Sequence, residues 1–350
     1  MLHRFAQLVA ACTILLVLAG SLVTSTGSGL SVPDWPTSYG WSMFTFPPSK
    51  WVGGILYEHT HRLIATTVGF LTIVLATWLW LKDPRPWMKR LGLVALGAVI
   101  AQGILGGLTV LFFLPAAVST AHAGLAEIFF CLTVAIALFT SPGWIEQRPS
   151  LLNPRGAPPP HAGSLISLAE PQALRRLTAA TTLLIYIQIL LGATMRHTGA
   201  GLAIPDFPLI FGGLVPPRWD DGIAIHFAHR VGALIVFVAI VSTAWYVRSH
   251  HRSRRDLTRP ATLLVALVLV QIALGGLTVL SGRNVAVNSA HVVVGALVLA
   301  TSLVLTLRAR HERIENVRLK ADATTSAVRG VRLRPSREAT AASHDGRARA

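Results

Sequence analysis

The chain has 350 residues, of which 52% are hydrophobic and only 13% charged, and its mean hydropathy is +0.57. This composition excludes an ordinary soluble domain, in which about 25% of residues are charged. The net charge of +16 does not indicate nucleic-acid binding, because the basic residues gather in the short loops and the tail of an apolar chain, where they determine topology.

The apolar residues are concentrated in runs long enough to cross a bilayer, for which about 20 residues are needed. We count eight such runs, at about 5–25, 61–81, 91–111, 118–140, 176–195, 227–247, 260–280 and 287–307. The sequence therefore predicts an all-α integral membrane protein with eight transmembrane helices.

The loops between these runs differ in charge. The loops at 82–90 and 248–259 are rich in Lys and Arg, whereas the loop after the third run is uncharged and the one after the seventh holds only Arg283. Because basic loops stay on the cytoplasmic side, we expect even-numbered spans to end in the cytoplasm. Both termini are then cytoplasmic, and the expected location is the plasma (inner) membrane, with lipid as a partner.

The two halves of the chain repeat one another. Thr26-Gly-Ser-Gly-Leu30 recurs as Thr198-Gly-Ala-Gly-Leu202, and Gly106-Gly-Leu-Thr-Val-Leu111 recurs as Gly275-Gly-Leu-Thr-Val-Leu280. Pro33-Asp-Trp-Pro36 likewise returns as Pro205-Asp-Phe-Pro208, and all copies are 168 to 172 positions apart. Four spans per half is an even number, so the repeat predicts two tandem four-helix bundles of the same orientation.

These observations divide the chain into four parts. We expect an N-terminal bundle at 1–140, a Pro-rich cytoplasmic linker at 141–173, a C-terminal bundle at 174–307 and a basic cytoplasmic tail at 308–350. The tail holds 11 Lys and Arg against 5 Asp and Glu. Such a composition is typical of a disordered segment that can touch anionic lipid.

Four histidines stand at duplicated positions near the outer ends of the even-numbered spans: His61 and His122 in the first half, His229 and His291 in the second. An ionisable side chain within a span is a functional hypothesis by default. No cluster of Cys, Asp or Glu completes a shell for a bare metal ion. Two imidazoles from facing helices can instead clamp an iron porphyrin, so the pattern favours one bis-histidine haem site in each half.

The surroundings of the paired histidines are not identical. Glu58 precedes His61 by three residues and shares its helix face, whereas the matching residue in the second half is His226. A carboxylate beside a haem site suits proton transfer, and a charge at a helix N-terminus is the alternative. Arg62 and Arg230 follow the histidines and could pair with haem propionates or extend to lipid headgroups.

The chain combines Glu58-His59-Thr60-His61-Arg62, His122, His229-Arg230, His291 and the repeated Gly-Leu-x-x-Pro-Asp-Trp/Phe-Pro loops. Through this combination it resembles the haem A synthase family over about residues 5–307. The resemblance implies an oxidoreductase that converts the ring methyl of haem O into a formyl group, giving haem A for cytochrome oxidase. An enzyme that produces haem O and an electron donor are the implied partners.

By the same resemblance, the N-terminal half binds the substrate haem O between His61 and His122, with Glu58 as the catalytic carboxylate. The C-terminal half holds haem b on His229 and His291. Some family members carry cysteine pairs in the outer loops, but the only cysteines here are Cys12 and Cys131, inside predicted spans. This departure leaves the route of electron supply open.

Two other readings explain part of the pattern. A dihaem b-type electron carrier linked to the quinone pool accounts for the four histidines but not for the difference between Glu58 and His226. A parallel-repeat transporter would need polar groups near the middle of the membrane. We interpret His59, two residues from His61 and on another face, as an interfacial residue solvated at the membrane surface.

Overall fold

The computed structural model describes residues 1–145 and 170–332, and this part of the chain is helical, with no strand. The first half contains α1 (Leu2–Ser25), α2 (Gly54–Lys82), α3 (Pro86–Leu111) and α4 (Ala116–Phe139), with the short η1 (Pro48–Lys50) in the loop between α1 and α2 and α5 (Pro142–Ile145) after α4. The second half contains α6 (Glu170–His197), η3 (Ala200–Leu202), α7 (Asp221–His250), α8 (Arg255–Leu280) and α9 (Val285–Arg332).

Eight of these helices, α1–α4 and α6–α9, are long and apolar enough to cross a membrane. The predicted all-α class with eight spans is therefore confirmed. Many large side chains on the faces of these helices that point away from the bundles are exposed, among them Phe70 at 64% and Trp245 at 68%. Such exposure is expected where hydrocarbon rather than water is the solvent.

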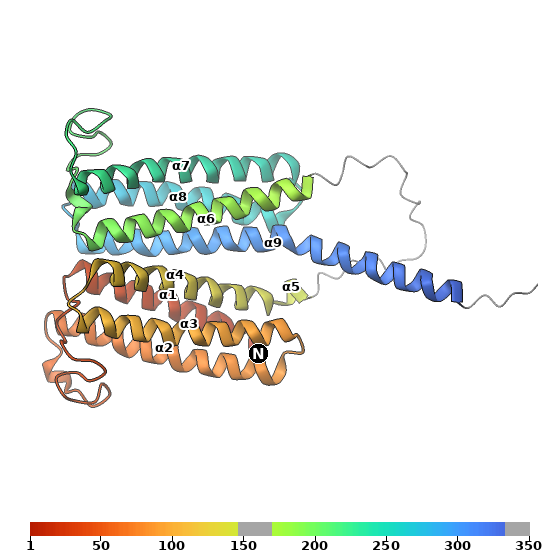
Figure 1. Cartoon of the computed structure of the whole chain (residues 1–350), viewed down its shortest axis with the longest axis horizontal. Coiled ribbons are helices and arrows are strands. Elements are labelled where there is room, and N and C mark those ends of the chain that lie inside the picture. Colours follow the sequence, from red (N-terminus) through yellow and green to blue (C-terminus); the bar gives the residue numbers. More distant parts are fainter. Residues whose placement is uncertain (146–169, 333–350) are drawn as a thin grey trace, which may run out of the picture.

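The helices form two groups, α1–α4 and α6–α9, that lie side by side (Figure 1). Each group has its own apolar core; Leu75 and Phe129 lie in the first, and Ile240 and Leu264 in the second. Phe130 of α4 packs between the groups against Ala296 and Ala300 of α9. The two long loops that follow α1 and α6 emerge at the same end of the molecule, as a parallel repeat requires (Figure 1). We call them the outer loops, and this end the outer end.

Helix boundaries follow local chemistry at several points. Asp220 precedes α7 and accepts a hydrogen bond from the Ile223 N–H at 2.8 Å, so it caps the helix. Pro86 stands at the start of α3, where a missing N–H costs nothing.

The predicted linker from 141 to 173 begins with α5 and ends inside α6, and its central residues lie outside the described part of the chain.

The last helix differs from the expectation. We predicted that the final span ends near 307, and the apolar span of α9 ends at His311. We also predicted that a disordered tail follows, but α9 continues through Arg332. The sequence from 308 to 329 contains neither Pro nor Gly, so nothing in it stops a helix locally. Residues 333–350 of the predicted tail lie outside the described residues.

Candidate functional site

Each of the four predicted ligand histidines lies about two turns inside its helix, which begins earlier than the apolar run suggested. His61 is the eighth residue of α2 and His122 the seventh of α4. His229 and His291 occupy similar places in α7 and α9. At 1.5 Å per residue these depths are about 10 Å, so the imidazoles lie toward the outer half of the bundle.

The histidines of each half lie within electrostatic reach of one another, His61 with His122 and His229 with His291. All four side chains are partly buried. The fold therefore brings together the pairs that the sequence predicted, each from two different helices.

A glycine on a neighbouring helix faces each imidazole. A Cβ at Gly20 of α1 would lie 3.0 Å from His61 Nε2, and one at Gly106 of α3 would lie 3.2 Å from His122 Cε1. The second half repeats this arrangement. A Cβ at Gly192 would lie 2.7 Å from His229 Cε1, and one at Gly275 would lie 3.2 Å from His291 Cε1. The four glycines thus leave room for imidazoles at the surfaces of α1, α3, α6 and α8.

The second glycine of each Gly-Gly pair receives the outer loop. A Cβ at Gly107 would lie 2.5 Å from the Trp35 ring, and one at Gly276 would lie 2.6 Å from the Phe207 ring. The repeated Gly-Gly and Pro-Asp-Trp/Phe-Pro motifs therefore meet in space. One glycine accommodates a histidine, and the next accommodates the aromatic residue of the outer loop.

Each loop is held in shape by its aspartate. Asp34 accepts hydrogen bonds from the Tyr39 N–H at 2.7 Å, the Gly40 N–H at 2.9 Å and the Thr37 hydroxyl at 2.5 Å. Tyr39 and Gly40 have φ of 52° and 75°, so the carboxylate stabilises a left-handed turn. Burial acts to raise the pKa of Asp34, but these hydrogen bonds outweigh it and hold that pKa below its usual value.

Asp206 makes the same turn in the second half. It accepts hydrogen bonds from the N–H groups of Phe211 and Gly212, both at 2.8 Å. The hydrogen bond from Gly212 contributes most to lowering the pKa of Asp206. Phe211 and Gly212 have φ of 52° and 78°, so the duplication preserves the turn together with its carboxylate.

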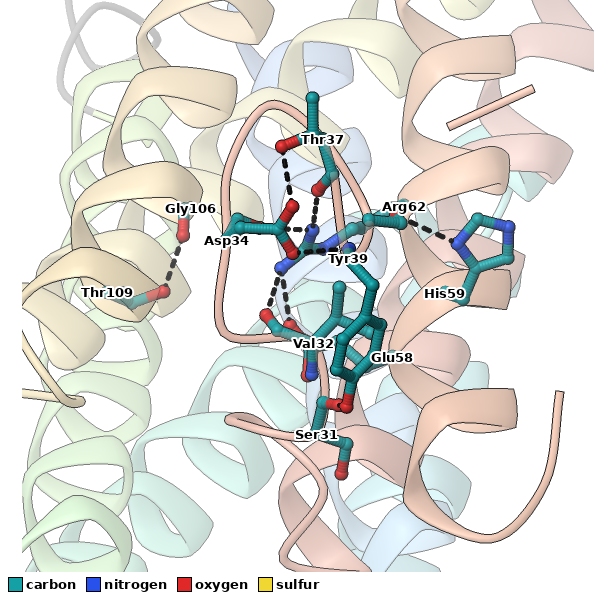
Figure 2. A network of polar contacts seen from close by, with 11 residues as sticks. Ser31, Val32, Asp34, Thr37, Tyr39, Glu58, His59, Arg62, Gly106 and Thr109 are labelled. Atoms are coloured by element: carbon teal, nitrogen blue, oxygen red, sulfur yellow. Dashed lines mark hydrogen bonds and ion pairs between the residues drawn. The ribbon is translucent and has the colours of Figure 1, made fainter. Parts of the chain in front are cut away.

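Arg62 joins the loop to α2 (Figure 2). Its Nη1 donates to the carbonyls of Asp34 at 2.7 Å and Thr37 at 2.9 Å, and its Nη2 donates to the Val32 carbonyl at 2.7 Å. Nη2 also donates to Glu58 Oε1 at 2.7 Å, which completes an ion pair whose two residues are 8% and 4% exposed. Both terminal nitrogens of Arg62 are thus occupied by protein acceptors.

Arg230 does the same in the second half. It donates to the carbonyls of Leu209 at 2.8 Å, Ile204 at 3.1 Å and Asp206 at 2.6 Å. From the sequence, Arg62 and Arg230 were cofactor-binding candidates that could pair with haem propionates or extend to lipid headgroups. That role stays a prediction, and the observed contacts favour a different one, in which each arginine holds an outer loop.

Glu58 and His226 occupy equivalent places in the two halves. Glu58 Oε2 accepts a hydrogen bond from the Val32 N–H at 2.8 Å. At the matching place, the Ile204 N–H donates to His226 Nδ1 at 3.3 Å. Both side chains therefore attach the loop to the helix, but only the first half has a carboxylate there.

Two residues differ from what the sequence suggested. His59, expected to be solvated at the interface, is fully buried; its Nδ1 lies 3.2 Å from the Ser38 hydroxyl, and its ring packs against Phe46 and Trp51. Glu127 of α4, which we did not single out, is 5% exposed, and its Oε2 has no hydrogen-bond partner within the described residues. A charged residue within an apolar span was the signal for it.

Sequence reasoning also missed Gln188 of α6. Its Nε2 donates to the His229 carbonyl at 2.8 Å and lies 3.0 Å from His229 Nδ1. A lone glutamine in an apolar run carried little signal, because its partner lies 41 positions away.

The fold and the site define a polytopic membrane protein with two duplicated four-helix groups, each holding one pair of histidines below an outer loop. The family model described as cytochrome oxidase assembly protein (COX15-CtaA) matches residues 3–303. The chain belongs to this family.

Similar proteins support the same family. A protein named heme A synthase from Symbiobacterium thermophilum is 32% identical over 289 residues, which cover 80% of this chain and 86% of the relative. A heme A synthase from Halalkalibacterium halodurans is 30% identical over 309 residues, covering 86% of this chain and 95% of the relative.

Proposed function

We propose that this protein is a haem A synthase, an oxidoreductase that converts the ring methyl of haem O into a formyl group and so provides haem A for cytochrome oxidase. Membership of the cytochrome oxidase assembly family and the names of the similar proteins support this function. The observation that carries it is the duplicated pair of histidines, with a carboxylate beside only one of the two pairs.

The residues present fit a haem better than a bare metal ion. Within the described residues, no group of three or more His, Cys, Asp and Glu side chains could hold a metal ion. The buried Nδ1 atoms of His122 and His291 have no hydrogen-bond partner there. In each half, two imidazoles from different helices, each lying against a glycine, would hold the iron of a haem.

The first half would hold the substrate haem O between His61 and His122. Glu58 lies one turn before His61 and uses one lone pair on each oxygen, for Arg62 and for the Val32 N–H. A carboxylate has about four acceptor sites, so Glu58 can still accept a proton released at the substrate methyl group. The Trp35 ring of the outer loop packs against Gly107, next to the glycine that faces His122.

The second half would hold haem b between His229 and His291. When bound there, haem b would supply one-electron transfer to the neighbouring half. Gln188 fixes the position of His229 through its carbonyl, and His226 attaches the loop without introducing a carboxylate. These differences support a catalytic first half and an electron-relaying second half.

We also propose the division at 1–140, 141–173, 174–307 and 308–350, a location in the plasma membrane and cytoplasmic termini. The eight spans and the placement of both long loops at one end support this topology. An enzyme that makes haem O and an electron donor are the expected partners.

The test is chromatography of haems extracted from the purified full-length protein, produced with and without a source of haem O. We expect haem b without that source, and haem A or a hydroxylated intermediate with it. Two equivalents of haem b under both conditions would instead indicate the quinone-linked dihaem carrier, and absence of haem would refute both. The variant His229→Ala should lose the tightly bound haem while the protein still inserts into the membrane.

A further inference from the structure

One face of α6 carries three residues spaced by four, Gln188, Gly192 and Arg196, and this spacing places them in line along the helix. Gln188 donates to the His229 carbonyl, and Gly192 faces the His229 ring. Arg196 therefore lies one turn further toward the outer end, above the same histidine site.

The contacts of Arg196 leave most of its guanidinium available. Its Nη2 donates to the Ser21 carbonyl at 3.0 Å and to the Ser25 hydroxyl at 2.8 Å, both in α1. Within the described residues, its Nη1 and Nε have no hydrogen-bond partner, and no carboxylate forms an ion pair with it. Arg196 acts electrostatically on His291, the other histidine of the second half.

A second arginine lies nearby. Arg283 stands in the turn between α8 and α9 with φ of 65° and is exposed. Its Cδ would lie 3.7 Å from a Cβ at Gly201, and it acts electrostatically on Arg196. Arg196 and Arg283 both lie at the outer end of the second half, and no carboxylate of the described residues forms an ion pair with either.

The first half lacks these cations. The positions in α1 that match Gln188, Gly192 and Arg196 are Leu16, Gly20 and Thr24. Leu114 takes the place of Arg283, since it packs against Gly29 as Arg283 packs against Gly201. Of the three α6 positions, only the glycine that accommodates the histidine is shared.

We propose that Arg196 and Arg283 bind the carboxylate side chains of the tetrapyrrole held between His229 and His291, and that they make this half the retaining site. This inference rests on the proposed function. Guanidinium groups match carboxylates in geometry and charge, and both cations lie at the end of the bundle nearest the paired imidazoles.

The contrast between the halves agrees with their proposed roles. A resident cofactor must stay bound through many turnovers, whereas a substrate must enter and its product must leave. The first half offers hydrophobic Leu16 and Leu114 where the second offers Gln188 and Arg283. The terminal nitrogens of Arg62 and Arg230 already bind loop carbonyls or Glu58, whereas Arg196 has N–H groups that are free of partners among the described residues.

The test compares two probes, iron protoporphyrin IX and its dimethyl ester, in which both carboxylates are blocked. The full-length protein is stripped of haem and titrated with each probe, and histidine-ligated porphyrin is followed by its absorbance. The wild type should prefer the free acid by about tenfold or more, as expected for lost charge-assisted hydrogen bonds. The variant Arg196→Leu should lower this preference, and the double variant Arg196→Leu/Arg283→Leu should bring it close to one.

The ratio of the affinities for the free acid and the dimethyl ester separates a binding role of Arg196 from a structural one. If Arg196 only links α6 to α1, Arg196→Leu will weaken the binding of both probes equally and leave this ratio unchanged, which overturns the proposal. Arg218→Leu is the matched control, because Arg218 lies in the outer loop of the same half over the Phe211 ring, and it should keep the wild-type ratio.

A wild type that binds both probes equally also overturns the proposal, yet leaves the haem sites intact. A wild type that binds neither probe through histidine refutes the proposed function itself. As a second measurement, transfer of haem from the loaded protein to apomyoglobin should show a slow phase that Arg196→Leu accelerates; an unchanged slow phase contradicts the retaining role.

Discussion

The glycines that face the four histidines offer a graded test of the site. Replacing each by alanine adds one methyl group at a known distance from an imidazole. The Cβ would lie 2.7 Å from His229 for Gly192→Ala and 3.0 Å from His61 for Gly20→Ala. It would lie 3.2 Å from a ring atom for both Gly106→Ala and Gly275→Ala.

These distances predict an order of effects. Overpacking a well-filled position costs about 1–3 kcal/mol, and at 2.7 Å the ring of His229 must move because a Cβ cannot approach so closely. At 3.2 Å a shift of a few tenths of an ångström suffices. A cost of 1–3 kcal/mol corresponds to roughly 5- to 150-fold in haem affinity. Gly192→Ala should therefore lose the most haem affinity, and Gly106→Ala and Gly275→Ala should lose the least.

The controls come from the same fold. Gly97 and Gly103 of α3 have nothing within 4 Å of an added Cβ, so Gly97→Ala and Gly103→Ala should bind haem normally. In a helix interior, alanine is better than glycine by about 0.5–1 kcal/mol, so these controls should also unfold at the same temperature or slightly higher.

The assay is haem bound per protein after purification, with the thermal midpoint measured in parallel. If Gly192→Ala retained haem as well as Gly97→Ala does, the close approach of His229 to α6 would play no part in binding, and the reasoning would be refuted.

Three further predictions concern Glu58 and the outer loops. Glu58→Gln should keep haem binding, because the amide oxygen can still accept from Val32, but should lose turnover of haem O to haem A; full turnover would reject a proton-transfer role. Arg62→Ala should destabilise the protein more than Arg230→Ala, because only Arg62 pairs with a buried carboxylate and breaking such a pair costs about 3–5 kcal/mol; equal thermal midpoints would contradict this. The pKa values of Asp34 and Asp206 are held below their usual value. The ionised carboxylates therefore stabilise the loops fully above about pH 4, the usual pKa of aspartate. This stabilisation is lost as the pH falls through the lowered pKa. Protection of the loops from an acid-active protease should therefore fall below about pH 4, and Asp34→Asn should remove the pH dependence of the first loop.

Much of the architecture follows from local patterns in the sequence. The eight spans could be predicted because a bilayer requires about 20 apolar residues for each helix. The repeat then predicted which histidines correspond, and the structure brings His61 to His122 and His229 to His291. The end of α9 was misjudged, because loss of hydrophobicity marks the end of a span and does not mark the end of a helix.

The partners of individual polar groups could not be predicted in the same way. From the sequence, Arg62 and Arg230 could face haem propionates or lipid headgroups, and nothing in it pointed to the carbonyls 21 to 30 positions away in the outer loops that they bind. His59 was expected to be solvated, yet Phe46 and Trp51 enclose it. In each case the partner is supplied by a loop whose path is set by turns and packing.

The sequence by itself determined the membrane class, the duplication and the identity of the paired histidines, because these depend on composition, period and repetition along the chain. Only the tertiary structure decided that glycines receive the imidazoles, that the two arginines following histidines hold loops, and that Arg196 and Arg283 gather without a carboxylate partner among the described residues. The physical reason is that a side chain meets its partner through space, and packing brings together helices that the chain order keeps far apart.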